Sequence, residues 1–137
     1  GHGASRAMKW ALDDAMVNTS DIGYINAHGT STQANDAMET VAIKRVFGDY
    51  AKSLCVSSTK SMLGHALASS GAIEIVTCAL SLVDQIIHAT INYNTPDPIC
   101  DLDYVPNDAR QVDTLQYILS NSFGLGGQNA SIVLGRI

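Results

Sequence analysis

The sequence predicts a single α/β domain in which helices cover a mostly parallel β-sheet that has one antiparallel edge. Three observations lead to this prediction. Helical patterns alternate with short β-like runs over residues 3–91, which is typical of a parallel sheet covered by helices. The last two β-like runs are joined by a short glycine-rich segment, which indicates an antiparallel pair. A length of 137 residues suits one domain with a substantial core.

Composition narrows the functional classes before any motif is considered. Hydrophobic residues make up 46% and charged residues 15%, which indicates an ordered chain. The net charge of −5 provides no general attraction to nucleic acid or anionic lipid. We find no apolar run that approaches the ~18–20 residues of a membrane span. We therefore expect neither a nucleic-acid nor a membrane partner.

Three segments have the periodicity of helices. Apolar residues recur at three- and four-residue steps over residues 3–17, and again over residues 33–47, where Gly48 is a plausible stop. Residues 66–84 differ, because the stretch from Ala72 to Leu80 is apolar almost all round except for Glu74. That pattern predicts a helix buried on most of its faces.

Five short segments have the character of strands, and they complete the order α-β-α-β-α-β-loop-β-β. They cover residues 22–27, 54–58, 86–91, 117–121 and 130–134. Residues 94–113 contain all three prolines and are rich in aspartate, so we predict a long surface connection there.

Polar side chains and glycines follow three of the predicted strands. His28 and Gly29 end the first, Gly64 and His65 follow the second, and the segment 121–127, Asn-Ser-Phe-Gly-Leu-Gly-Gly, follows the fourth. The carboxyl ends of parallel strands open at the same edge of a sheet, where α/β proteins bind ligands. We therefore expect His28 and His65 to converge on one crevice, while His2 at the terminus and His88 inside a strand carry little functional weight.

Two neutral imidazoles aimed at one carbonyl oxygen would stabilise an oxyanion or an enolate. Metal binding is the competing use of such a pair. The sequence has no HExxH motif, no CxxC motif and no carboxylate triad near either histidine, so we predict no metal site.

Lys60 and Glu74 form a second candidate pair. Lys60 lies five residues before His65, and Glu74 is the only charge in the apolar helix. A buried carboxylate needs a partner, so an ion pair would satisfy both groups and hold Lys60 near His65. The alternative is that Glu74 reaches solvent through a narrow polar stripe.

The remaining candidates are hydroxyl and glycine positions. Thr30 and Thr32 alternate, so their hydroxyls would point the same way along an extended ligand, and Thr32 also suits a helix cap. Gly124, Gly126 and Gly127 match no phosphate-binding fingerprint, and instead permit a tight turn in which the flanking Phe123 can move or can belong to the core.

No nucleophile accompanies these groups. The three cysteines, Cys55, Cys78 and Cys100, lie in a strand, in the apolar helix and in the long connection, and none stands at a strand-to-helix elbow. Their odd number and the absence of CxxC spacing predict free thiols and a reducing compartment. The sequence therefore contains groups that can polarise a carbonyl, but no nucleophile that they could assist.

Taken together, the segments 26–32, 58–65 and 121–127 resemble the C-terminal half of a β-ketoacyl-[acyl-carrier-protein] synthase, most closely the elongating, type II-like branch of fatty-acid synthesis. The resemblance runs over essentially the whole chain, with Gln128 as a departure where the family usually has threonine. It implies a thiolase-like half with a five-stranded mixed sheet, and residues 1–137 as one domain of that kind.

The same resemblance implies a reaction and roles for the residues. The family condenses malonyl-acyl-carrier-protein, by decarboxylation, with an acyl thioester on an active-site cysteine, and needs no cofactor. His28 and His65 would bind the malonyl carbonyl, Lys60 and Glu74 would order the site, and Thr30 and Thr32 would bind phosphopantetheine. Phe123 would gate the site and contribute to the oxyanion hole, in a loop with Gly124, Gly126 and Gly127.

The family's nucleophilic cysteine belongs to an N-terminal half that these residues lack, so we expect no condensation from residues 1–137 alone. The implied partner is acyl carrier protein, the full-length form is expected to be a homodimer, and the location is bacterial cytoplasm, mitochondrion or plastid. The alternatives are a non-catalytic partner subunit of the same fold, a polyketide synthase ketosynthase module, and a thiolase. Retention of His28, Lys60 and His65 argues against the first, and the two-histidine pattern argues against the last.

Overall fold

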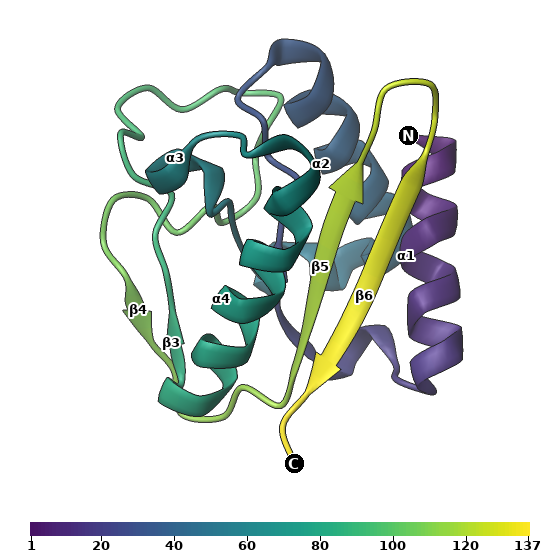
Figure 1. The fold of residues 1–137 in the computed structure, drawn as a ribbon, viewed down its shortest axis with the longest axis vertical. Coiled ribbons are helices and arrows are strands. Elements are labelled where there is room, and N and C mark those ends of the chain that lie inside the picture. Colours follow the sequence, from purple (N-terminus) through teal and green to yellow (C-terminus); the bar gives the residue numbers. More distant parts are fainter.

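The computed structural model describes residues 1–137 as a mixed four-stranded sheet with helices on both faces (Figure 1). The strand order is β2-β1-β5-β6. Strand β1 (Ile22–Asn26) pairs in parallel with β2 (Cys55–Ser57) and with β5 (Tyr117–Phe123). Strand β6 (Asn129–Gly135) pairs antiparallel with β5, which places it at the edge. The predicted class of sheet is confirmed, and so is its antiparallel edge.

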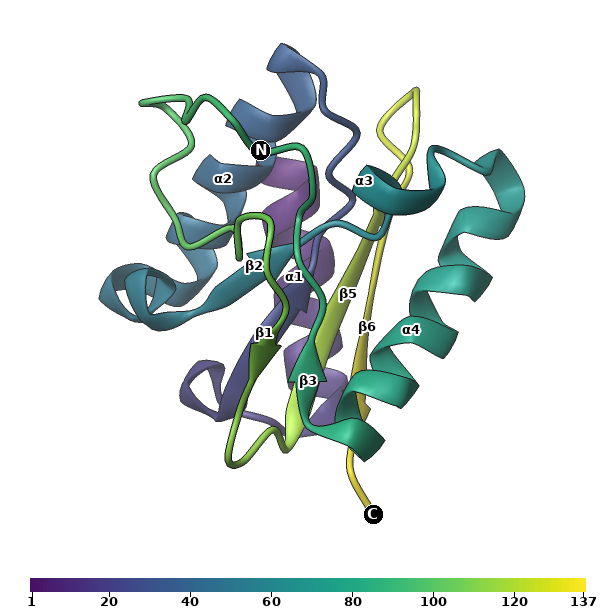
Figure 2. The same ribbon diagram turned by 90° about the vertical axis from the view of Figure 1, so that its left-hand side faces the viewer.

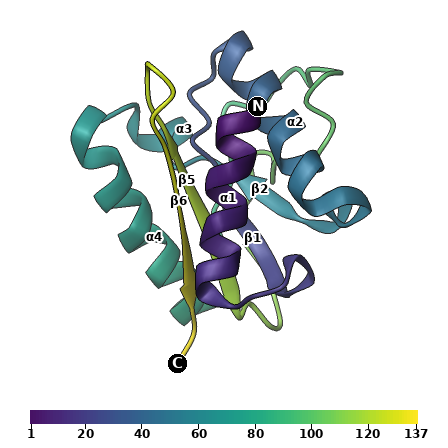
Figure 3. The same ribbon diagram turned by 90° about the vertical axis from the view of Figure 1, so that its right-hand side faces the viewer.

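Helices α1 (His2–Ala15) and α2 (Gln33–Phe47) cover one face of the sheet, and α4 (Ser70–Asp84) covers the other, as the view along the sheet shows (Figure 3). The predicted limits of α1 and α2 agree with the structure to within about two residues. Thr32 caps α2, because its side chain accepts a hydrogen bond from the backbone N–H of Asn35.

Each face of the sheet has its own apolar core. Under α1 and α2 the core includes Met8, Ile25, Ile43 and Val56, and under α4 it includes residues such as Ile118. The prediction that the apolar residues of α2 form its buried face is wrong in part. Val41, one of those apolar residues, is exposed, whereas Glu39 and Thr40 are buried. A glutamate on the inner face of α2 therefore needs a structural explanation.

The resemblance implied a fifth strand in the main sheet, and this is wrong. The predicted strand 86–91 shortens to β3 (Ile86–Ile87), which pairs with β4 (Arg110–Gln111) in a separate antiparallel sheet. β4 lies inside the segment that we predicted to be a surface connection. Beside β2, the position of a fifth strand is occupied by the segment around Asp103, which makes only a single bridge with Cys55. β3 is drawn in front of β5 in Figure 2, and Figure 1 shows it beside β4, away from β5 and β6.

Two boundaries near the site also differ from the prediction. Residues Lys60–Leu63, for which no element was predicted, form a short helix, α3. Strand β5 extends through Phe123, so Asn121 and Ser122 lie within the strand and the turn consists of residues 124–128. The antiparallel register with β6, which pairs Phe123 with Asn129, provides the hydrogen bonds that extend β5.

Helix α4 does not bury most of its faces, contrary to the prediction. Its buried stripe is largely polar (Ser70, Glu74, Cys78, Ser81 and Leu82), and it faces the sheet. Large apolar side chains lie on the outside, among them Val76, Leu80 and Val83, which are between 56% and 71% exposed. An apolar surface of this kind marks a surface that another element covers.

The prediction that no segment reaches membrane-spanning length also needs correction. By length and composition alone, residues Leu67–Asp84 are long and apolar enough to cross a membrane. The segment begins with a 3-10 turn (Leu67–Ser69), and α4 packs against β5 with a buried ion pair at Glu74. Those contacts are typical of a helix in a folded domain.

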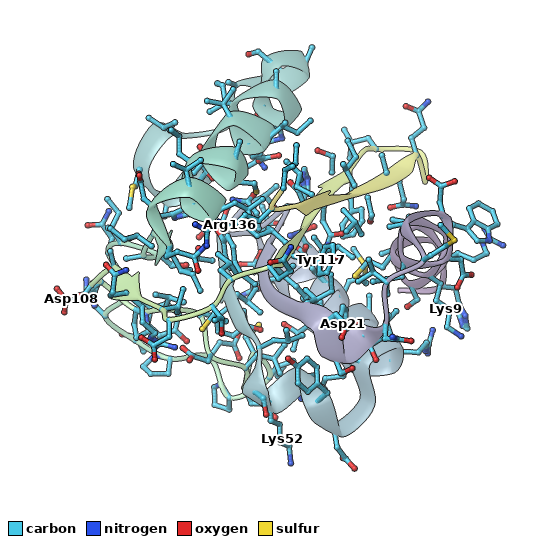
Figure 4. The ribbon with its side chains drawn as sticks, turned by 90° about the horizontal axis from the view of Figure 1, so that it is seen from below. Lys9, Asp21, Lys52, Asp108, Tyr117 and Arg136 are labelled. Atoms are coloured by element: carbon cyan, nitrogen blue, oxygen red, sulfur yellow. The ribbon has the colours of Figure 1, made fainter.

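The carboxyl ends of β1, β2 and β5 meet at the end of the sheet where α3 lies, as predicted (Figure 1). Figure 4 views the opposite end, where β5 begins at Tyr117 and the chain leaves β6 at Arg136. At that end the labelled charged side chains, including Lys9, Lys52 and Asp108, point outward at the periphery. The candidate site therefore lies at the end with α3.

Candidate functional site at the carboxyl ends of the strands

His28 and His65 converge, as the positions of their strands predicted. Their ring centroids lie 5.6 Å apart and the rings are nearly perpendicular, at 84°. His28 follows β1 and is only 8% exposed, whereas His65 is exposed in the loop after α3. Two rings at this separation leave room for one oxygen atom within hydrogen-bond distance of both.

Local hydrogen bonds determine the tautomer of His65. The backbone N–H of Leu67 donates to its Nδ1 at 3.1 Å, and Ser70 Oγ lies 3.2 Å from the same nitrogen. A backbone N–H is only a donor, so Nδ1 is an acceptor and the neutral ring carries its proton on Nε2. In His28, Nδ1 is buried without a partner. Burying a nitrogen lone pair without a partner costs less free energy than burying an N–H without one. His28 is therefore also favoured with its proton on Nε2.

His28 stays neutral at neutral pH because of its surroundings. Burial, and then the proximity of Lys60 and His65, lower the pKa of His28 to about 4. A neutral imidazole keeps one N–H to donate without adding a charge that would have to be desolvated.

We predict that the ring of His28 titrates near pH 4. Because the pKa is lower in the folded state than the value of ~6.5 of an unfolded chain, the unfolded state binds more protons between these values. The stability contributed by neutral His28 is thus complete above pH ~6.5 and is lost as the pH falls toward 4. An NMR titration of the His28 ring measures this directly, and a midpoint at or above pH 6 would contradict it.

Lys60 and Glu74 form the predicted ion pair between Lys60 Nζ and Glu74 Oε1. Their side chains are 5% and 2% exposed, so the alternative in which Glu74 reaches solvent is wrong. Ser122 Oγ, from β5, lies 3.5 Å from the other carboxylate oxygen. The pair thus links α3, which carries Lys60, to α4 across the end of the sheet.

Glu39 is the residue at this site that the sequence interpretation missed. Its carboxylate is buried and accepts hydrogen bonds from the backbone N–H groups of His28 (2.9 Å) and Gly29 (3.0 Å). Asn121 Nδ2 donates to it at 3.1 Å and Asn35 Nδ2 at 3.4 Å. Burial raises its pKa, while these bonds oppose that rise. Glu39 therefore fixes the turn that presents His28.

Gly29 completes this turn. Its φ of +42° lies in the left-handed region, and a Cβ there would come within 2.5 Å of Ser58 Cβ. Ser58 Oγ also donates to the carbonyl oxygen of Gly29 at 2.9 Å. The end of β2 is thereby held against the residue that follows His28.

We predict that Glu39→Gln lowers the free energy of unfolding by about 1–3 kcal/mol, because the amide NH₂ meets backbone N–H donors and leaves one buried donor unpaired. Equilibrium urea unfolding measures the change. The exposed Asp108→Asn is the matched control, since it also replaces a carboxylate by an amide. Equal stability of wild type and Glu39→Gln would show that the carboxylate does not hold the turn.

Thr30, Thr32 and Phe123 also lie at this end of the sheet. The Oγ1 atoms of the two threonines are 3.0 Å apart, and the cap formed by Thr32 leaves both hydroxyls near the surface. The ring of Phe123 lies 5.8 Å from that of His28 and is buried. Beyond it, Gly126 and Gly127 have φ near +85°, and Leu125 between the glycines is fully exposed.

The cysteines do not approach an activated state. Burial raises the pKa of Cys55, and it raises that of Cys78 to about 12. Cys100 is partly exposed in the segment between β3 and β4. No group of three or more His, Cys, Asp or Glu side chains lies close enough together to hold a metal ion.

A pocket of about 580 Å³ adjoins the site on the α2 side. It is lined by Gly29, Thr32 and Ser58, and on its far side by residues of the 90–104 segment such as Tyr93 and Tyr104. Neither His28 nor His65 lines it, so the pocket is distinct from the point where the two histidines converge.

Comparison with known proteins places these features in context. The profile of one family, described as "Beta-ketoacyl synthase, C-terminal domain", matches residues 1–94. The chain is 54% identical over 133 residues to 3-oxoacyl-[acyl-carrier-protein] synthase 2 of Staphylococcus aureus, an alignment that covers 97% of the chain and 33% of that protein. It is 50% identical over 132 residues to the protein of the same name from Synechocystis, covering 96% and 32%.

A solved structure is similar to the chain over nearly its whole length. It contains a ketosynthase of a type II polyketide synthase, bound to a hexaketide and in complex with its acyl-carrier protein. It matches with a TM-score of 0.95 and 44% identity, covering 98% of this chain and 33% of that one. The chain thus spans about a third of the length of the relatives that it matches.

Proposed function

Because the chain belongs to the family of β-ketoacyl synthase C-terminal domains, as its motifs predicted, we propose that it forms the two-histidine side of a condensing active site within a longer protein. The observation that carries this proposal is the convergence of His28 and His65, whose rings lie 5.6 Å apart. Lys60, Glu74 and Glu39 hold the elements that present them.

In the proposed reaction, the malonyl thioester loses its carboxylate as CO₂, and the electron pair of the broken carbon–carbon bond passes into the thioester as an enolate. The Nε2–H groups of His28 and His65 donate to the enolate oxygen, where the negative charge develops. The enolate carbon then attacks an acyl thioester on a cysteine, a new carbon–carbon bond forms, and the thiolate leaves.

The nucleophilic cysteine lies outside residues 1–137 in this proposal. Cys55 and Cys78 are buried with raised pKa values, which argues against their acting as thiolate nucleophiles. The exposed apolar side of α4 supports a domain arrangement in which the rest of the protein packs there and brings the cysteine to the histidines.

We assign fatty-acid elongation as the pathway and malonyl- and acyl-carrier-protein as the substrates. The named relatives with 50–54% identity are 3-oxoacyl-[acyl-carrier-protein] synthases, which supports both assignments. Thr30 and Thr32 would bind the phosphopantetheine arm, and Phe123 with Gly124, Gly126 and Gly127 would form the gate. The same relatives come from bacteria, which supports our assignment of a bacterial cytoplasmic location, and a homodimer of the full-length protein stays a prediction.

The test measures acyl loading and condensation separately. With an acyl donor and malonyl-acyl-carrier-protein, the full-length protein is expected to form an acyl-enzyme and then a β-ketoacyl product. Residues 1–137 alone are expected to form neither. Stoichiometric acylation of the isolated chain, detected by mass spectrometry, would overturn the assignment of the nucleophile to another part of the protein.

Polyketide synthesis is the second candidate function, because the polyketide ketosynthase shares 44% identity and a TM-score of 0.95 with this chain. The two functions differ in the acyl chain that the enzyme extends. Rapid extension of saturated acyl thioesters supports fatty-acid elongation, whereas a preference for poly-β-ketoacyl thioesters favours the polyketide role.

A further inference from the structure

A buried hydrogen-bond network lies beside the proposed catalytic group, on the side of the sheet that faces α4. Its five members come from β1, from β2 and the start of α3, and from the residue after β3; they are Tyr24, Asn26, Ser57, Thr59 and His88. All except His88 are at least nine-tenths buried. The expectation that His88 lies inside a strand is wrong, since β3 ends at Ile87.

His88 is the hub of this network. Its Nε2 lies 2.9 Å from Tyr24 Oη, 3.2 Å from Asn26 Nδ2 and 3.2 Å from Thr59 Oγ1. Asn26 Nδ2 also donates to Thr59 Oγ1 at 2.8 Å, and Tyr24 Oη lies 2.8 Å from Ser57 Oγ. One imidazole nitrogen therefore connects β1 with the chain that follows β2.

The partners on the two sides of the ring specify one protonation state. Nε2 faces the Tyr24 and Thr59 hydroxyls and the Asn26 amide, all of which can donate to it, so it is placed to act as an acceptor. Nδ1 lies 3.1 Å from the carbonyl oxygen of Ala89, which is only an acceptor, so Nδ1 carries the proton. Burial lowers the pKa of His88, while the hydrogen bond to the Ala89 carbonyl opposes that shift.

Two members of the network adjoin residues of the proposed site. Asn26 lies two residues before His28 on the same strand end. Thr59 immediately precedes Lys60 and stands at the start of α3. Because α3 is a single short helix, the position of Lys60 depends on how Thr59 is held.

We propose that His88, as a neutral Nδ1–H imidazole, is a positioning residue that ties the ends of β1 and β2 together and so sets the placement of His28 and Lys60. The proposal rests on the proposed function for its consequence in catalysis. Protonation of His88 would place an N–H at Nε2, so the hydrogen bond from the Asn26 amide would be lost and the Tyr24 and Thr59 hydroxyls would have to turn their lone pairs toward the ring.

Other ionisable groups on this side of the sheet do not take over that role. Tyr24 on β1, Cys55 on β2 and Cys78 on α4 all have a pKa raised by burial, so they are neutral at neutral pH. The nearby charges are paired, Lys60 with Glu74 and Arg110 of β4 with Asp103. His88 is thus the group whose protonation changes the charge of the network as the pH falls below neutral.

Two substitutions of His88 distinguish a positioning role from a role in packing alone. His88→Leu fills the space but removes the acceptor, whereas His88→Gln retains a neutral acceptor and cannot titrate. In the full-length protein, His88→Leu is expected to lower kcat for malonyl decarboxylation by about 100-fold with little change in KM. His88→Gln is expected to retain most of kcat and to remove the contribution of His88 to the acidic limb of the pH profile. The exposed His2→Gln is the control.

A second measurement does not depend on activity. With ¹⁵N-labelled histidine in the full-length protein, the resonances lost in His88→Gln identify His88, and they are expected to show the neutral Nδ1–H tautomer at pH 7. A protonated or Nε2–H ring, or wild-type kcat in His88→Leu, would overturn the proposal. A wild-type protein that shows this tautomer but no decarboxylation would instead contradict the proposed function.

Discussion

Replacing His28 by alanine in the full-length protein is expected to abolish malonyl decarboxylation while acyl loading continues. The substitution removes one of two N–H donors to the developing enolate, and loss of one such donor costs about 10²–10³-fold in rate. Loading uses the cysteine and needs no enolate, so it is spared. Release of CO₂ from malonyl-acyl-carrier-protein and mass spectrometry of the acyl-enzyme measure the two steps separately.

The exposed His2 provides the matched control, because His2→Ala removes an imidazole far along the chain from the site. His28→Asn is a second comparison, since it restores an N–H donor on a shorter side chain and is expected to recover part of the rate. Normal decarboxylation in His28→Ala would refute the role given to this histidine, and equal loss of loading would point to a structural defect.

Breaking the Lys60–Glu74 pair is expected to have the largest effect on stability. Lys60→Met leaves a carboxylate that is 2% exposed without its cation, and Glu74→Leu leaves the buried ammonium alone. Removing one partner of a buried pair costs about 3–5 kcal/mol, because the remaining charge is desolvated and uncompensated. Urea unfolding of the single variants measures this loss.

The double variant Lys60→Met/Glu74→Leu separates stability from function. Replacing a buried ion pair by apolar residues of similar volume is often neutral or stabilising, so the double variant is expected to unfold near the wild-type midpoint. Decarboxylation is expected to stay low, since Lys60 is absent. If the double variant regained decarboxylation as well as stability, the role of Lys60 would be structural only.

The exposed pair Lys44–Asp101 serves as the control for this experiment. Its side chains are 37% and 50% exposed, and water and salt screen such charges. Lys44→Met is expected to leave the unfolding midpoint unchanged within error. A similar loss at both pairs would show that burial does not explain the effect at Lys60.

The positions of the candidate site residues could be predicted because they depend on local sequence. Histidine and glycine at the end of a β-like run place a polar group where a parallel strand stops, and this holds for His28 whatever the packing. The lone charge of Glu74 in an apolar helix predicted a buried partner for the same reason, and Lys60 was the candidate at the right distance along the chain. Local pattern and residue type sufficed for these assignments.

Glu39 and His88 show where such reasoning stops. Neither has a local signal: Glu39 is a glutamate in an ordinary helical pattern, and His88 follows a two-residue strand. Their partners lie on other elements, such as Asn121 for Glu39 and Thr59 for His88. Hydrogen bonds between residues that are far apart in sequence are decided only when the strands are in register.

The sequence by itself determined the fold class, the family and the identity of the catalytic candidates, because each is written in periodicity or in contiguous motifs. Tertiary structure alone decided that the main sheet has four strands, that α4 turns its polar stripe inward, and that His28 and His65 meet at 5.6 Å. An apolar pattern all round α4 cannot specify which face is buried, since every rotation of the helix offers similar apolar area. The side chains of Lys60, Ser122 and Glu74, brought together by the fold, select one rotation.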